Sequence, residues 1–299
     1  MDRAGAVLPP STLLMEMRRL LWLVSILLLL TSFALASGHG PVFGYGTPTN
    51  SQGEWSFDFG LLERNTRLGS QLTVRSMFTY GFTPYMQLSL TAPAIVTNTN
   101  VPTTMMTGGD FFQSNFAWRF QHKAPAIGKR IETTAFGGFV VPGPQPGLGL
   151  MSRVARAPGF NAGVVSGLAS RSQYFWIGGG YTRFMERNNT RMPTTLSYSL
   201  VYGYRPRALR KDYPAWDWRL FGELTGERDS ELIMGGVPMP GTHVHQVFLG
   251  PTTLGIYKTF AISGGVQFPI YRDVGLLLPR ERVRVAINVT YFLFPHGQQ

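Results

Sequence analysis

The residues of this chain that could bind a metal lie mainly in one segment, 234–245. It holds two methionines, Met234 and Met239, followed by His243 and His245. Thioether sulfur and imidazole nitrogen together suit copper, and two histidines two positions apart share one face of an extended chain. These residues form a candidate copper site. The alternative is that the methionines only fill gaps in the packing.

A second candidate copper ligand, His39, depends on how the chain is processed. Cleavage after Ala36 would leave Ser37-Gly38-His39 at the new N-terminus. A free amine, two deprotonated amides and the third residue's imidazole can surround Cu²⁺ or Ni²⁺ in a square plane. A histidine in an export linker with no metal role is the alternative.

Few residues of this chain could catalyse hydrolysis. The sequence contains no nucleotide-binding loop, zinc-protease helix or nucleophile elbow. His243 and His245, with Glu227, are the residues that could together activate a water or a nucleophile near one rim. We therefore expect no enzymatic activity and no resident cofactor, with a hydrolase of lipase or protease type as an alternative.

Charged residues elsewhere are scattered singly, opposite the apolar positions of alternating segments. Such residues share one polar face of a strand. Two interpretations stay open: paired charges that fill a narrow interior, or an arginine-rich constriction that favours anions. The residues expected to face the interior are Asp58, Arg75, Arg119, Arg171, Arg183, Arg219, Glu223, Glu227, Arg282 and Arg284.

The segment 282–294 shows which element positions these charges. Its odd positions from Val283 to Leu293 are apolar, and its even positions begin with Arg282, Arg284 and Ala286. The pattern recurs about a dozen times, in segments near the length of a tilted strand that crosses a bilayer. We therefore predict an all-β fold, a transmembrane antiparallel up-and-down β-barrel of about 12 strands.

The N-terminus is typical of an exported protein. Arg18 and Arg19 precede an apolar core at 20–30, and a small-residue cleavage site ends at Ala36. The expected organisation is a signal peptide at 1–36, a flexible periplasmic segment at 37–53, the barrel at 54–294 and a C-terminal tail at 295–299.

The expected connections alternate between tight and long. Tight joints fall on the side where the barrel begins, and most long ones fall on the opposite side; the segment 206–216 is the exception. This asymmetry is typical of barrels in a bacterial outer membrane. The long connections are at about 96–109, 142–159, 228–245 and 271–281.

Composition limits the partners. The net charge is +11 and there is no cysteine, so no disulfide framework or thiolate site exists. A basic balance often indicates nucleic acid, but these arginines are dispersed along strands and not clustered. We expect no nucleic acid; the expected partners are outer-membrane lipid and lipopolysaccharide, a small-molecule solute and the barrel assembly machinery.

Five phrases carry a family resemblance. They lie at 80–93, 116–120, 135–142, 264–269 and 289–294. Together they resemble the MetA-like outer-membrane proteins named for phenol-degradation pathways. The resemblance implies a transporter of small aromatic or hydrophobic compounds, or a role beside heavy-metal efflux, and it brings no catalytic residues.

We therefore expect a porin-like outer-membrane channel for passive movement of small solutes. A structural or adhesive envelope barrel without transport is the main alternative, and the hydrolase a third. Two glycine clusters, 178–180 and 264–265, could open the wall so that an apolar solute leaves sideways, or serve only barrel curvature.

Overall fold

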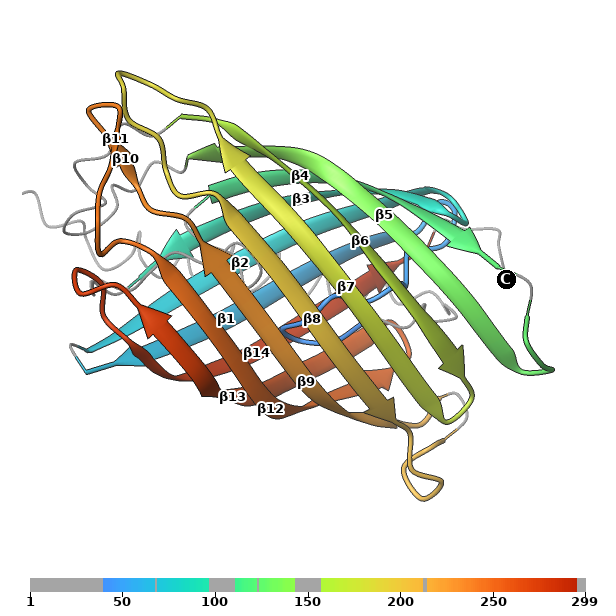
Figure 1. Cartoon of the computed structure of the whole chain (residues 1–299). Helices are drawn as coiled ribbons and strands as arrows, with labels where there is room; N and C mark the ends of the chain where they lie inside the picture. Colours follow the sequence, from blue (N-terminus) through green and yellow to red (C-terminus); the bar gives the residue numbers. More distant parts are fainter. Residues whose placement is uncertain are drawn as a thin grey trace, which may run out of the picture.

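A computed structural model describes residues 40–67, 69–96, 111–122, 124–142, 157–211 and 214–294. Twelve strands close into one barrel, in which β14 pairs with β1 and all neighbours are antiparallel (Figure 1). A small separate hairpin, β10–β11, lies between β9 and β12 in the chain. The strands are β1 (Trp55–Thr66), β2 (Gly69–Thr83), β3 (Met86–Ile95), β4 (Phe111–Gln121), β5 (Lys129–Pro142), β6 (Gly159–Ser170), β7 (Gln173–Phe184), β8 (Thr195–Tyr204), β9 (Asp217–Asp229), β10 (Ile233–Met234), β11 (Val237–Pro238), β12 (Val244–Tyr257), β13 (Phe260–Val274) and β14 (Glu281–Leu293).

Alternation along each strand decides which side chains face outward and which face the lumen. In β1, Phe57 and Phe59 are about half exposed, at 51% and 50%, whereas Ser56, which precedes them, is fully buried. An outer wall of phenylalanine and leucine is stable in lipid and not in water. The predicted fold is confirmed, and the chain is a β-barrel of the bacterial outer membrane. Among the described residues, no helix is both long and apolar enough to span a bilayer.

The two ends of the barrel differ in their connections. We call the end that holds Trp55 the inner mouth and the opposite end the outer mouth. Turns of two residues at the inner mouth join β2 to β3, β6 to β7 and β12 to β13, whereas the outer mouth carries the β10–β11 hairpin and most of the longer connections. Short turns mark the periplasmic side of such barrels. The connection 205–216 is the long one at the inner mouth, as expected, and a short β1–β2 turn is the exception at the outer mouth.

Residues 40–54, which we call the strap, lie inside the barrel (Figure 1, blue trace). Phe43, Thr47 and Asn50 have exposed fractions of 2%, 1% and 2%. The expectation of a flexible periplasmic segment at 37–53 is therefore wrong for residues 40–53. The polar backbone of this stretch finds partners on the lumen wall, which a composition rich in Gly, Pro and Thr does not reveal. The signal peptide 1–36, His39 and the tail 295–299 lie outside the described residues.

Candidate functional site

The strap is anchored at Glu223, in the middle of β9. The backbone N–H groups of Val42, Phe43 and Gly44 donate to its two carboxylate oxygens at 2.8, 2.8 and 2.7 Å. The hydroxyl of Thr252 on β12 donates to the same carboxylate. Successive N–H groups around one anion form a nest, and such charge-assisted bonds are about twice as strong as neutral ones. Glu223 therefore fixes the far end of the strap within the lumen.

Further contacts hold the strap between this anchor and the inner mouth. The Tyr45 N–H donates to Ser199 Oγ at 2.9 Å, and the Tyr45 hydroxyl lies 2.6 Å from Ser197 Oγ. Closer to the inner mouth, the Trp176 indole donates to Thr47 Oγ1 at 3.0 Å. The strap thus crosses the lumen from β9 to the wall near the inner mouth.

A compact ionic network lies nearer the outer mouth. Arg284 donates to Glu227 at 2.6 Å and to Glu281 at 2.8 Å, and Glu281 also pairs with Arg64. The Arg284 guanidinium carbon lies 3.8 Å from the centre of the Phe248 ring. All four charged side chains are at most 3% exposed. Two arginines thus face two glutamates, so this part of the lumen follows the paired-charge interpretation.

Most of the predicted interior residues lie in the lumen. Arg171 lies in the β6–β7 turn and lines a cavity at the inner mouth. Those that face the lumen from strands are Asp58, Arg75, Arg119, Arg219, Glu223, Glu227 and Arg284.

Arg183 does not face the lumen. Its neighbours Thr182 and Phe184 are buried inside, so the alternation of β7 turns Arg183 outward, where it is exposed. The sequence pattern of this strand is ambiguous because inward residues such as Trp176 are apolar as well. An apolar position could therefore not be assigned to one face.

Arg282 is displaced by an irregularity at the outer end of β14. Asn65 pairs with Val283, but the next residue, Thr66, pairs with Glu281. Arg282 is thus the extra residue of a bulge, and Glu281 takes the inward place. Arg282 is exposed, which makes the prediction of a lumen position wrong.

The ladder between β3 and β4 ends before the strands do. It contains six residue pairs, the last of which joins Thr91 to Gln113. Both strands continue toward the outer mouth, β3 as far as Ile95 and β4 from Phe111. Beyond this pair, the described residues of β3 and β4 form no further ladder pairs with each other, and we call this part of the wall the seam.

A proline explains where the seam starts. The Arg119 N–H donates to the Tyr85 carbonyl at 2.7 Å, and the Val96 N–H donates to the Leu72 carbonyl at 2.8 Å. Odd-numbered residues of β3 therefore bond with β4, and even-numbered ones bond with β2. The odd-numbered residue after Thr91 is Pro93, which has no N–H. The ladder stops where its next donor is missing.

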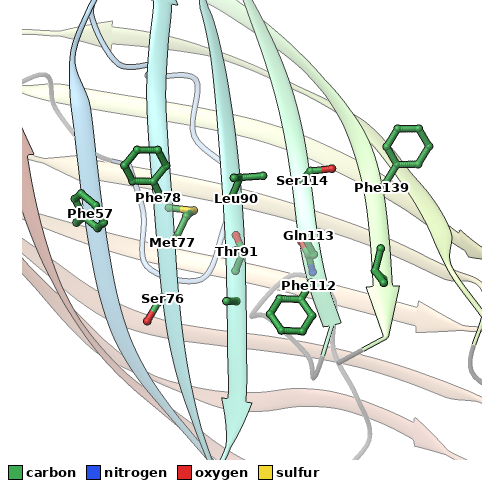
Figure 2. Close-up of a pocket in the computed structure, with 12 residues that line it drawn as sticks. Phe57, Ser76, Met77, Phe78, Leu90, Thr91, Phe112, Gln113, Ser114 and Phe139 are labelled. Carbon is green, nitrogen blue, oxygen red and sulfur yellow. The ribbon is translucent and has the colours of Figure 1, made fainter. Parts of the chain in front are cut away.

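Two cavities with shared lining residues lie at the inner end of the seam, and Figure 2 shows the residues that line the outer one. The outer one, the seam groove, has a volume of about 440 Å³, and the inner one, the seam chamber, about 170 Å³. Met77, Thr91 and Gln113 line both. The seam groove is lined mainly by outward side chains, including Phe57, Phe78, Leu90, Phe112, Phe139 and Val141. The seam chamber lies in the lumen between Tyr45 of the strap and Arg75, Asn115, Phe136 and Asn161 of the wall.

The seam chamber has polar atoms without partners. Gln113 Nε2, Asn115 Oδ1 and Asn161 Oδ1 are buried and have no hydrogen-bond partner among the described residues. Such a group costs about 1–3 kcal/mol when it stays unpaired. These atoms fit a chamber that receives a water or the polar group of a solute.

The candidate copper ligands make other contacts. His243 Nε2 lies 3.4 Å from Asp273 Oδ1, and His245 Nε2 lies 3.2 Å from the Tyr198 hydroxyl. No three His, Cys, Asp or Glu side chains gather as a metal site within the described parts of the chain. Met234 and Met239 pack against an apolar cluster at the outer mouth that consists of Phe111, Val140, Phe184, Met192 and Leu232.

The residues considered for hydrolysis do not lie together. Glu227 lies in the lumen and is bonded to Arg284 at 2.6 Å. His245 belongs to the outward-facing positions of β12, because its neighbours Val244 and Gln246 are buried inside. The barrel wall thus separates the histidine from the carboxylate.

Several functional residues escaped sequence reasoning. Glu132, Trp176 and Glu281 hold the strap or the ionic network, yet no motif surrounds them. Pro93 carried a readable signal, because a proline inside a strand is confined to edges and irregular places. Its consequence depends on the register with β4, which the sequence does not state.

No protein-family model matches the sequence, and no curated protein matches it. Among solved structures, the COG4313 outer membrane channel from Pseudomonas putida F1 is similar with a TM-score of 0.53 and 8% identity, over 82% of this chain and 97% of that one. The KdgM porin has a TM-score of 0.42 and 10% identity over 79% and 98% of the two chains. LpxR from Salmonella typhimurium has a TM-score of 0.41 and 8% identity over 80% and 100%. The likeness to the first shows a shared fold.

Proposed function

We propose that this protein is a passive outer-membrane channel for small, largely apolar solutes, which pass between lumen and lipid through the β3–β4 seam. One observation carries the proposal. The seam groove and the seam chamber share Met77, Thr91 and Gln113 as a common wall at the end of the ladder. Movement of these three side chains would connect the lumen with the membrane.

The dimensions suit a small aromatic molecule. A protein cavity of about 150 Å³ can hold benzene. The seam chamber, at about 170 Å³, therefore has room for one ring. Its unpaired Gln113, Asn115 and Asn161 atoms could accept a single polar substituent, while the phenylalanines of the seam groove suit the ring itself.

The strap favours a sideways route over a straight one. Tyr45 of the strap forms one wall of the seam chamber, and the preceding residues of the strap are bonded to Glu223. The glycine clusters do not provide the exit. Residues 178–180 pair with both β6 and β8, and residues 264–265 pair with both β12 and β14.

The cargo class follows from the lining and agrees with the resemblance to MetA-like proteins. The structurally similar protein from Pseudomonas putida F1 is likewise an outer membrane channel. A role beside metal export, the other implication of the resemblance, gains no support from the contacts of the described histidines and methionines.

The test is to fill the shared wall. Met77→Trp places a large ring where the groove and the chamber meet. In a Gram-negative host with a low background of apolar uptake, the entry of N-phenylnaphthylamine is followed by its fluorescence in the membrane. We expect the uptake rate of cells with the Met77→Trp variant to fall to that of cells without the channel. Ser263→Trp, a lumen position on the distant strand β13, is the matched control and keeps the wild-type rate.

The amount of folded barrel is compared by its mobility in unheated SDS gels. Equal uptake by wild type and Met77→Trp, with both folded, would overturn the side route. No uptake by the wild type above the empty host would favour the structural envelope protein instead.

A further inference from the structure

A third cavity, at the inner mouth, differs in character from the two at the seam. It has a volume of about 380 Å³ and is lined by Arg119, Arg130, Arg171, Arg205 and Arg219. These residues come from β4, β5, the β6–β7 turn, the end of β8 and β9, all at the periplasmic end. The strap supplies another wall through Thr47, Thr49 and Ser51. We call this cavity the arginine pocket.

Carboxylates neutralise only part of this charge. Asp217 pairs with Arg205 at 2.6 Å and with Arg219 at 3.3 Å. Glu132 lies 3.6 Å from Arg119 and 3.5 Å from Arg130. Five guanidinium groups thus share two carboxylates, which leaves an excess of three positive charges around the pocket.

The outer part of the pocket remains open to a ligand. Arg130 has a side-chain exposure of 56%, and Arg171 lies exposed in its turn. Deeper inside, Arg119 Nε is buried and has no hydrogen-bond partner among the described residues. Like charges brought together repel one another, and an unpaired buried donor adds to this cost. A bound anion would relieve both.

We propose that the arginine pocket binds a small oxyanion, a carboxylate or a phosphate, on the periplasmic side of the strap. Guanidinium groups present planar forks of N–H donors that match the paired oxygens of these groups. On the opposite wall the strap contributes Ser51, whereas Thr47 and Thr49 already donate their hydroxyl protons to Glu132 and to the Pro84 carbonyl. This site goes beyond the proposed function, because it lies away from the seam and takes a ligand of opposite character.

The experiment uses the full chain, purified in a neutral detergent. Calorimetric titration with benzoate and with inorganic phosphate is run at low and moderate salt. The variant Arg130→Gln/Arg171→Gln removes two exposed guanidiniums of the pocket, and the buried Glu132 keeps its contact with Arg119. Loss of two charge-assisted bonds should weaken binding about tenfold or more.

The matched control is Arg207→Gln/Lys211→Gln, which makes the same change of charge in the exposed β8–β9 connection outside the pocket. It should leave the dissociation constant within about twofold, since scattered surface charges contribute little. Equal weakening in both variants would mean diffuse attraction and would overturn the site. If the wild type binds neither benzoate nor phosphate, the site is overturned as well.

A second arm identifies the source of the anion. In nanodiscs, competition of anionic phosphatidylglycerol with phosphate would mean that a lipid headgroup is the oxyanion; unchanged binding would mean a free solute. Uptake of N-phenylnaphthylamine is measured in parallel. The double variant should leave it unchanged, so failure of the anion site and failure of the seam route are distinguishable.

Discussion

Two sides of the barrel wall differ in how their residues are paired. On β14, β1 and β9, Arg284 joins Glu227 to Glu281 in a fully buried network. On β3 and β4, the ladder stops at Pro93, and neighbouring polar atoms such as Gln113 Nε2 lack partners. One side is cross-linked by side chains across the lumen, and on the other the described pairing of β3 with β4 ends at Thr91 and Gln113. A single alternating pattern therefore accommodates both a wall with a continuous ladder and one whose ladder ends early.

The strap connects the two sides. Its end is bonded to Glu223 on the charged side, while Tyr45 lines the seam chamber. The strap thus joins the side that carries the ionic network to the seam, where Tyr45 forms one wall of the seam chamber. We therefore expect substitutions in the ionic network to lower the stability of the barrel, and substitutions at the seam to lower transport.

The largest effect is expected at Arg284. Arg284→Met removes the cation that Glu227 and Glu281 share and leaves both carboxylates buried with too little compensation. Breaking a buried pair in this way costs about 3–5 kcal/mol. The free energy of unfolding, measured by guanidinium titration in detergent, should fall by that amount.

Arg228→Met is the matched control for that measurement. Arg228 lies on the same wall as Glu227, faces outward and is exposed. A change there should stay within about 0.5 kcal/mol. If both variants lose the same stability, the buried ionic network stabilises the barrel no more than an exposed arginine does.

The next effect concerns the strap. Glu223→Gln replaces an anion that accepts three backbone N–H bonds by an amide with one acceptor oxygen. Docking should weaken by roughly 2–4 kcal/mol, because hydrogen bonds to charged groups contribute about 1.5–3 kcal/mol each. The strap is then expected to leave the lumen for part of the time. Conductance across planar bilayers should rise above that of the wild type.

Ser199→Ala should give a smaller effect in the same experiment. It removes one neutral bond, from the Tyr45 N–H, and should weaken docking by only about 1 kcal/mol. In a cysteine-free chain, Tyr45→Cys reports directly, since a water-soluble maleimide should label it faster when Glu223→Gln is also present. Unchanged labelling and unchanged conductance together would show that Glu223 does not hold the strap.

The outer wall could be predicted from sequence because lipid and lumen impose a strict period of two. In β14 the apolar positions Val285 and Ile287 face outward as expected. The same rule failed at Arg282, since a bulge depends on pairing with β1 and leaves no mark in the alternation. Strand pattern therefore gives the class and the count of strands, but not local register.

The strap and the seam were beyond sequence reasoning for different reasons. Phe43 and Thr47 belong to a stretch with no periodicity, and their burial comes from partners far along the chain, such as Glu223 and Trp176. Pro93 was visible, but the direction of its missing donor follows only from the register of β3 with both neighbours. Tertiary contacts decide the first case, and pairing geometry decides the second.

The smallest expected effect tests the seam itself. Pro93→Val restores a backbone N–H directed at β4, opposite Phe111, and lets the ladder continue by one pair. One additional hydrogen bond contributes about 0.5–1.5 kcal/mol, so the free energy of unfolding should rise slightly. Uptake of N-phenylnaphthylamine should fall, because the wall closes where the groove meets the chamber.

Pro251→Val is the matched control, because it also changes a proline within a strand. The pairing of β12 with β13 resumes at Thr252↔Gly265, directly after Pro251, so no comparable seam opens there. This variant should keep the wild-type uptake. If Pro93→Val gains stability and uptake stays the same, solutes do not use the seam, and the openness of this side of the wall has no role in transport.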